Sequence, residues 1–304
     1  MPDLTKAYRN VFHELSDPLK YDVRTVHDHY VVKKGICNNE KTTVVIRVDV
    51  DSAFHLSIPL IEELSRYNLK STHYFLTFPE RYYNIWDSTI LKKIIDKGHE
   101  IGLHTDHLYE QIKFNIDGIK SLKQDIKRLS ELISEPIKGM VFHGHPEIDK
   151  HGLRNWDLYK NIDPSDLGLE YTDGYKSCYI TPESKTWKPK CDLQLTDYMG
   201  FPYSWGWNYL PNYAVKKIKK NAKPGNLLHI SFHTQSAFKY WIDWDYSYNE
   251  TPLKHDSFTI FWYKKIIIWI NWVVIPFFVK ILDKFGIEEQ LIVKIYRKFF
   301  KKCQ

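Results

Sequence analysis

The feature that most constrains the fold is a regular alternation of short apolar runs with longer amphipathic segments between residues 43 and 142. The apolar runs are rich in β-branched residues, which is typical of buried strands. Strands are predicted at Thr43–Val48, Thr72–Leu76, His99–Leu103, Gly139–Phe142 and, after an irregular stretch over 144–225, at Asn226–Phe232. Helices are predicted at Ser57–Tyr67, Ser88–Lys97 and about Ile112–Ile133. This alternation predicts an α/β fold whose parallel sheet has right-handed crossovers.

The composition favours a folded chain without a nucleic-acid partner. A hydrophobic fraction of 43% over 304 residues is enough to bury a sizeable core. The net charge is only +6, and no basic stripe with interleaved aromatic residues runs through the main body, so no nucleic acid is expected to bind. The four cysteines have no close paired spacing and the first residues form no apolar signal segment. These two observations predict free thiols and a cytoplasmic location.

Carboxylates and imidazoles follow the carboxyl ends of four predicted strands. In chain order they are Asp49 and Asp51, then His104, Asp106 and His107, then His143 and His145, and finally His233. Each residue alone has an ordinary explanation as a loop, cap or core residue. Their coincidence at the ends of parallel strands, where loops converge, favours a shared site. Because these ligand types bind Zn²⁺ or another divalent metal with one position left open for water, the sequence predicts a metal site.

Several runs of the sequence resemble the polysaccharide deacetylase superfamily, which is carbohydrate esterase family four and is also called the NodB-homology domain. The runs are IRVDVDSAF, STHYFL and GHEIGLHTDH, and Gly98–His104 matches the family's Gly-His-Glu-Ile-Gly-x-His element at every position. A later run, VFHGHPEIDKHGLRNWDLY, is similar to a segment of divergent members from surface-polysaccharide biosynthesis clusters, and LLHISFHTQ resembles the family's late strand with a terminal histidine. The resemblance covers roughly residues 43–240. It implies an irregular (β/α)7-type barrel of the glycoside hydrolase and deacetylase kind.

The resemblance also implies roles for individual residues. Asp49 would be the general base, Asp51 and His104 would be metal ligands, and His233 would be the general acid that protonates the leaving amine. These roles need a base and an acid with separated pKa values on either side of a metal-activated water.

The chain departs from the family pattern at two places. The family presents a second histidine four residues after the first, but Leu108 stands there, so His107 is predicted as the third ligand. His143 and Asp106 remain alternative ligands, and His145 is an alternative ligand or substrate contact. The first motif is Asp-Val-Asp rather than two adjacent aspartates, a variant that includes imide-acting members.

The function predicted from these features is metal-dependent removal of an acyl group, such as acetyl, from an N-acylated sugar or polysaccharide precursor. One alternative is a related C–N hydrolase that acts on a small amide, imide or formamide. A second alternative, from another class, is a non-catalytic saccharide-binding protein on the same scaffold.

Three segments are predicted along the chain. Residues 1–42 form an N-terminal extension that packs on the barrel, residues 43–257 form the barrel, and residues 258–304 form aromatic and basic C-terminal helices. The last segment is too interrupted by charge for a spanning helix. It is predicted to cover the barrel or a dimer interface, or else to make a peripheral contact with the inner face of the membrane through its tryptophans and lysines.

Overall fold

The computed structural model of the chain describes residues 4–51, 54–77, 86, 88–173, 179–180, 191–197 and 212–238. Its centre is a nine-stranded sheet in the order β7-β6-β5-β4-β3-β2-β9-β8, with β1 beside the first half of β2. All strands pair in parallel except β6 with β7. The strands are β1 (Tyr21–Arg24), β2 (Thr42–Val50), β3 (Thr72–Leu76), β4 (Glu100–Thr105), β5 (Gly139–Phe142), β6 (Tyr171–Asp173), β7 (Tyr179–Ile180), β8 (Leu193–Thr196) and β9 (Leu227–His233).

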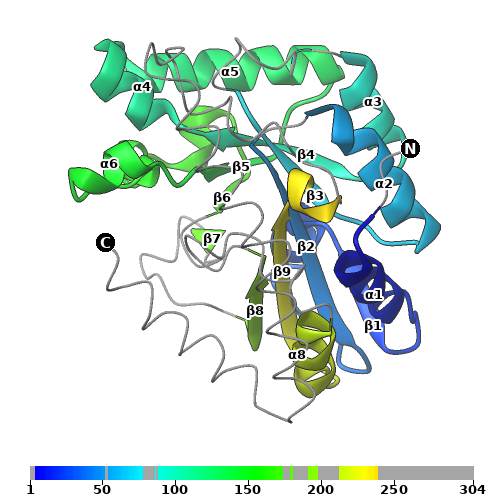
Figure 1. Cartoon of the computed structure of the whole chain (residues 1–304). Helices are drawn as coiled ribbons and strands as arrows, with labels where there is room; N and C mark the ends of the chain where they lie inside the picture. Colours follow the sequence, from blue (N-terminus) through cyan, green and yellow to red (C-terminus); the bar gives the residue numbers. More distant parts are fainter. Residues whose placement is uncertain are drawn as a thin grey trace, which may run out of the picture.

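Helices α1 (Lys6–Leu15), α2 (Ser57–Arg66), α3 (Ser88–Asp96), α5 (Gly118–Ile133) and α8 (Tyr213–Asn221) cover the outer side of this sheet. Two further helices, α4 (His107–Phe114) and α6 (Pro146–Lys150), pack against each other in a separate cluster. Figure 1 shows α5, α3, α2, α1 and α8 following one another around the sheet. The predicted parallel strand–helix barrel is confirmed, in the form of a half-barrel: within the described residues, β7 and β8 end the sheet without pairing with each other.

The alternation of side chains along β2 separates the apolar core from the polar interior. Val44, Ile46 and Val48 are fully buried in the large core between the sheet and the helices. Arg47 and Asp49 lie at the intervening positions, on the inner side of the half-barrel, because successive strand residues point to opposite faces. The inner side of the strand therefore carries charged residues toward its carboxyl end.

The N-terminal residues belong to both layers of the fold. The α1 helix buries Tyr8 and Phe12, whose rings pack against Phe232 of β9. The β1 strand pairs with β2 from Tyr21 to Arg24, so residues before position 42 extend the sheet as well as covering it.

Two of the predicted elements differ from the structure. The single helix predicted over Ile112–Ile133 is wrong: α4 ends at Phe114, and Asn115 follows in a left-handed conformation with φ 53°. The Asp117 carboxylate then accepts a hydrogen bond from the Lys120 backbone N–H and caps α5. The stretch predicted as irregular over 144–225 contains α6, β6, β7, β8 and α8.

The predicted C-terminal helices over 258–304 lie outside the described residues. Within the described part of the chain, none of the helices has the length and hydropathy needed to span a lipid bilayer. Among the cysteines that the structure describes, Cys37 is a free thiol.

Candidate metal centre

The carboxyl ends of β2, β4, β5 and β9 meet at one edge of the sheet. Asp49 of β2 is in register with His233, the last residue of β9, and Asp51 follows directly after β2. His104 is the penultimate residue of β4, beside Val141 of β5, and His143 follows β5. The parallel pairing therefore brings together side chains that are as far as 184 residues apart in the sequence, from Asp49 to His233.

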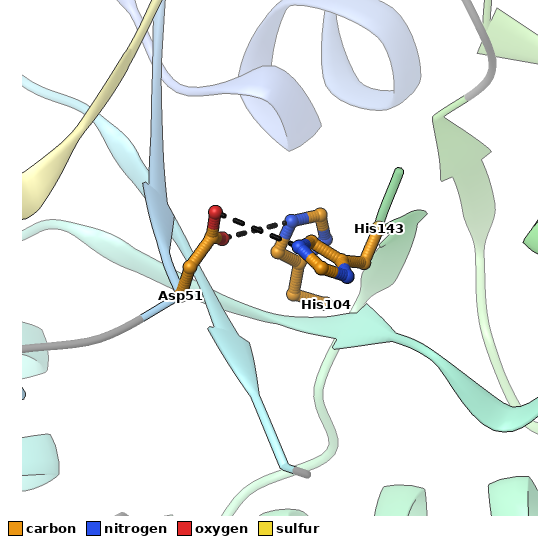
Figure 2. Close-up of side chains that lie close together, drawn as sticks. All are labelled: Asp51, His104 and His143. Carbon is orange, nitrogen blue, oxygen red and sulfur yellow. Dashed lines mark ion pairs between the residues drawn. The ribbon is translucent and has the colours of Figure 1, made fainter. Parts of the chain in front are cut away.

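Asp51, His104 and His143 form a compact group that could hold a metal ion (Figure 2). One ligand atom from each residue lies within 4.8 Å of the others. His104 Nε2 is 3.1 Å from Asp51 Oδ1, and His143 Nε2 is 3.7 Å from Asp51 Oδ2. Figure 2 shows both imidazoles turned toward the carboxylate. Two imidazoles and one carboxylate are a donor set that divalent transition metals bind readily.

The hydrogen bond made by His104 Nδ1 indicates which ring nitrogen of His104 carries the proton. His104 Nδ1 lies 3.2 Å from the backbone carbonyl oxygen of Val141, which can only accept a hydrogen bond. Nδ1 therefore carries the proton, and in the neutral ring Nε2 presents its lone pair to Asp51. Metal-binding histidines are commonly oriented by a hydrogen bond from the other nitrogen in this way.

The carboxylate of Asp51 has the properties expected of a cation ligand. Burial raises the pKa of Asp51, but the imidazoles of His233, His104 and His143 outweigh burial and hold the pKa well below its ordinary value. Asp51 Oδ1 is buried and, among the described residues, accepts no hydrogen bond of good geometry, although His104 Nε2 is close. A buried, ionised oxygen with two imidazole nitrogens close by fits a divalent cation held between them.

His233 lies between two carboxylates. Its Nε2 is 3.3 Å from Asp51 Oδ2, and its Nδ1 donates to Asp197 Oδ1 at 2.9 Å. Burial lowers the pKa of His233, but Asp197 and Asp51 outweigh burial and raise it well above 6.5. Asp197 is itself fully buried and accepts hydrogen bonds from Tyr8 Oη at 2.7 Å and from the Ser236 hydroxyl.

Asp49 is held by a two-point ion pair within its own strand. Arg47 Nε and Nη2 donate to the two carboxylate oxygens of Asp49 at 2.6 and 2.7 Å. Burial raises the pKa of Asp49, whereas Arg47, His104 and His233 lower it, and the net shift is downward. Asp49 is therefore ionised and fixed in orientation at neutral pH.

The other predicted residues lie around this group in different settings. His107 is fully buried, with Nδ1 2.7 Å from the hydroxyl of Thr105 and Nε2 3.2 Å from Asp125 of α5. The structure thus groups Asp51 and His104 with His143 rather than with His107. Asp106 Oδ2 lies 3.5 Å from His143 Nδ1, and the ring of His145 stacks on Tyr109 at 3.7 Å.

Three residues of the site were absent from the sequence predictions. Asp197 follows β8 directly, so the rule that located the other carboxylates applies to it once the short strand LQLT is recognised. Arg47 is two residues before Asp49 in β2, and strand alternation places the two on the same face. Asn155 donates to Asp106 and to the backbone of His143, and no sequence pattern points to it.

The fold and these side chains define a parallel β/α half-barrel with an Asp–His–His group at the carboxyl ends of its strands. Comparison with protein-family models finds no match, and neither does comparison with curated proteins. Similar solved structures include the polysaccharide deacetylase Bc1974 from Bacillus cereus, at 15% identity and a TM-score of 0.41, covering 64% of this chain and 80% of that chain. The peptidoglycan deacetylase PdaC from Bacillus subtilis matches at 14% identity and a TM-score of 0.39, covering 64% and 78%.

A third similar structure is BA3943 from Bacillus anthracis, described as a carbohydrate esterase family 4 pseudoenzyme. It matches at 10% identity and a TM-score of 0.34, covering 65% of this chain and 58% of that chain. These identities and TM-scores are too low to assign an activity to this chain. The similar structures also include both deacetylases and a pseudoenzyme. The function of this chain has to be argued from its own side chains.

Proposed function

We propose that this chain is a metal-dependent hydrolase that removes an acyl group from an N-acylated saccharide. The observation that carries the proposal is the group of Asp51, His104 and His143, flanked by one ionised carboxylate and one imidazole with a raised pKa. Bound Zn²⁺ or another divalent ion would polarise the amide carbonyl and make a coordinated water more acidic. The remaining work of the reaction falls to Asp49 and His233.

Asp49 is the proposed general base. A base must be ionised before it accepts a proton, and the pairing with Arg47 keeps the Asp49 carboxylate charged at neutral pH. The same two-point contact fixes the direction of the carboxylate, which favours transfer from a water held in one place. Asp49 is the penultimate residue of β2 and Asp51 follows two residues later, so the proposed base lies beside the proposed metal ligand.

His233 is the proposed general acid. Protonating a leaving amine requires an imidazole that carries a proton at neutral pH, and the raised pKa of His233 meets this requirement. The hydrogen bond to Asp197 fixes Nδ1, so that Nε2 faces Asp51 and the group around it. A base and an acid with pKa values displaced in opposite directions are the arrangement that acyl-amide hydrolysis needs.

The substrate class rests on the sequence resemblance rather than on any contact in the structure. The runs IRVDVDSAF and GHEIGLH, whose family acts on N-acetylated sugars, supply three of the proposed site residues: Asp49, Asp51 and His104. We therefore propose an N-acetylated saccharide or polysaccharide precursor as the substrate.

Metal content and acetate release test the proposal together. The purified full chain should contain about one divalent ion per chain and should release acetate from N-acetylated oligosaccharides when supplied with Zn²⁺, Co²⁺ or Mn²⁺. Asp51→Asn should lose both the bound metal and the acetate release, because it removes the only carboxylate of the donor set. A wild-type chain without stoichiometric metal would overturn the proposal, and metal binding without acetate release would leave only a binding protein.

A matched pair of variants tests the choice of third ligand. His143→Gln should remove the metal, whereas His107→Gln should retain it, because His107 is engaged by Thr105 and Asp125 instead. The reverse result, metal lost only in His107→Gln, would show that the donor set is assigned to the wrong histidine.

A further inference from the structure

A buried asparagine lies behind the candidate metal ligands. Asn155 begins the short 3-10 turn Asn155–Leu158, and only 1% of its surface is exposed. Its Nδ2 donates to Asp106 Oδ1 at 2.5 Å and to the backbone carbonyl of His143 at 2.7 Å. Its Oδ1 accepts from the backbone N–H of Tyr109 at 3.3 Å. One amide therefore links the end of β4, the start of α4 and the end of β5.

Asp106 divides its two carboxylate oxygens between this amide and the histidines. While Oδ1 accepts from Asn155, Oδ2 lies 3.5 Å from His143 Nδ1 and 3.9 Å from His145 Nε2. Only 3% of the Asp106 side chain is exposed, so its direction is set by these neighbours. The carboxylate sits behind the imidazole of His143, whose other nitrogen faces Asp51.

His143 lies just outside a regular element. It follows the last residue of β5, and its backbone N–H donates to the carbonyl of Thr105 at 2.8 Å. Its backbone carbonyl accepts from Asn155. The two backbone contacts fix the main chain, and the carboxylate of Asp106 is placed to orient the ring.

We infer that Asp106 and Asn155 are positioning residues that make His143 the third metal ligand. This inference rests on the proposed function, since it assigns how that same site is built. A carboxylate behind a metal-bound imidazole favours the tautomer whose lone pair faces the metal, and it increases the basicity of that nitrogen. Asn155 acts one step further out, because it fixes both the carboxylate and the backbone of the ligand.

The chain offers a control with the same chemistry in a different place. Buried His107 and half-buried Asp125 form a second imidazole–carboxylate pair, at 3.2 Å, that ties the start of α4 to α5. Asp125→Asn alters that pair and leaves the group of Asp51, His104 and His143 untouched. If Asp106 served only to stabilise the junction of strand and helix, Asp106→Asn and Asp125→Asn would have similar consequences.

The test is the affinity of the full chain for Zn²⁺ and Co²⁺, measured by calorimetric titration or by competition with a chelator. Asp106→Asn and Asn155→Ala should each weaken metal binding about 10- to 100-fold, whereas Asp125→Asn should keep the wild-type affinity. The Co²⁺ absorption bands should change in the Asp106 and Asn155 variants, because the direction of one imidazole changes. Urea unfolding of the metal-free proteins measures any loss of stability separately.

The outcomes separate the two proposals. A wild-type chain that binds neither ion defeats the proposed function and this inference with it. A wild-type chain that binds metal, with Asp106→Asn and Asp125→Asn equal to it in affinity and in Co²⁺ spectrum, defeats the positioning role alone. Should Asn155→Ala fail to fold, Asp106→Asn, which keeps the size of the side chain, decides the matter by the same measurements.

Discussion

Arg47 and Asp49 are neighbours on one strand with different proposed roles. Their side chains lie on the same inner face of β2, where Asp49 would act as base and Arg47 holds it by two hydrogen bonds. A bidentate guanidinium contact fixes the plane of a carboxylate, which a lysine ammonium cannot do because it is a single point charge. The orientation of the proposed base therefore depends on arginine in particular.

Arg47→Lys is expected to lower the rate of acetate release about 100-fold, the cost typical of a misplaced reacting group. The bound metal should remain, because Arg47 holds Asp49 and neither residue belongs to the group of Asp51, His104 and His143. Initial rates and metal content measured on the same preparation check this. Arg24→Lys, which alters the pair with Asp22 at the far end of the sheet, serves as the control and should leave both values unchanged.

The residues of the site were predictable from sequence to different degrees. Asp51 and His104 follow from the rule that parallel strands end at one edge, and the structure brings them together. The choice between His107 and His143 depends on which neighbour takes each ring, and only the fold places Asp125 beside His107. Asn155 contacts the backbone of a distant segment, so the spacing of residues in the sequence does not predict its role.

At the scale of elements, two glycines allow large rings to lie inside the half-barrel. An added Cβ at Gly139 of β5 would lie 2.1 Å from the Tyr171 ring, and at Gly102 of β4 it would lie 2.5 Å from the Tyr74 ring. The hydroxyls of these tyrosines are 2.9 Å apart, and Tyr171 also donates to Glu100 at 2.6 Å. The glycines are therefore required by the packing between neighbouring strands.

Gly139→Ala is expected to destabilise the fold by about 1–3 kcal/mol, because the ring of Tyr171 has to move and the contact with Glu100 is strained. Urea unfolding measures this loss. Gly144→Ala is the matched control, since a Cβ there meets nothing within 4 Å and the unfolding midpoint should hardly change. Equal midpoints for the wild type and Gly139→Ala would show that the interior has more room than the packing indicates.

Element boundaries were predicted with uneven success, and the length of the apolar pattern did not decide it. The strand Thr72–Leu76 and the strand Gly139–Phe142 have the predicted bounds. The break between α4 and α5 was missed because isoleucines recur at helical spacing on both sides of Asn115, and the turn is made by a single left-handed residue. The four residues of β8 are too few to show a period, so Asp197 at their end went unnoticed.

The whole molecule buries several histidines away from the metal group in neutral form. Burial lowers the pKa of His29 to about 4 and that of His229 to about 3. His73 and His99 share the hydroxyl of Ser71, at 2.9 and 2.8 Å, near the amino ends of β3 and β4. Burial, helped by Lys70 and Lys97, lowers the pKa of His99 to about 4, and burial lowers that of His73 well below 6.5.

These lowered pKa values predict loss of stability in mild acid. In the unfolded chain each imidazole takes up a proton near its usual pKa of 6.5, whereas folded His99 stays neutral until about pH 4. Below about pH 6.5 the unfolded state binds more protons at this site, so the site's contribution to the free energy of unfolding is present above that pH and falls as the pH drops toward 4.

His99→Asn removes the titrating ring but can keep the bond to Ser71. We expect its urea midpoint to fall less than that of the wild type between about pH 7.5 and about pH 5. His143 and His233, whose pKa values are raised, act in the opposite direction in both proteins and cancel in the comparison. His13→Asn, which alters a solvent-exposed histidine of α1, is the control and should follow the wild type. An equal fall in all three proteins would mean that His99 is protonated alike in the folded and unfolded chains.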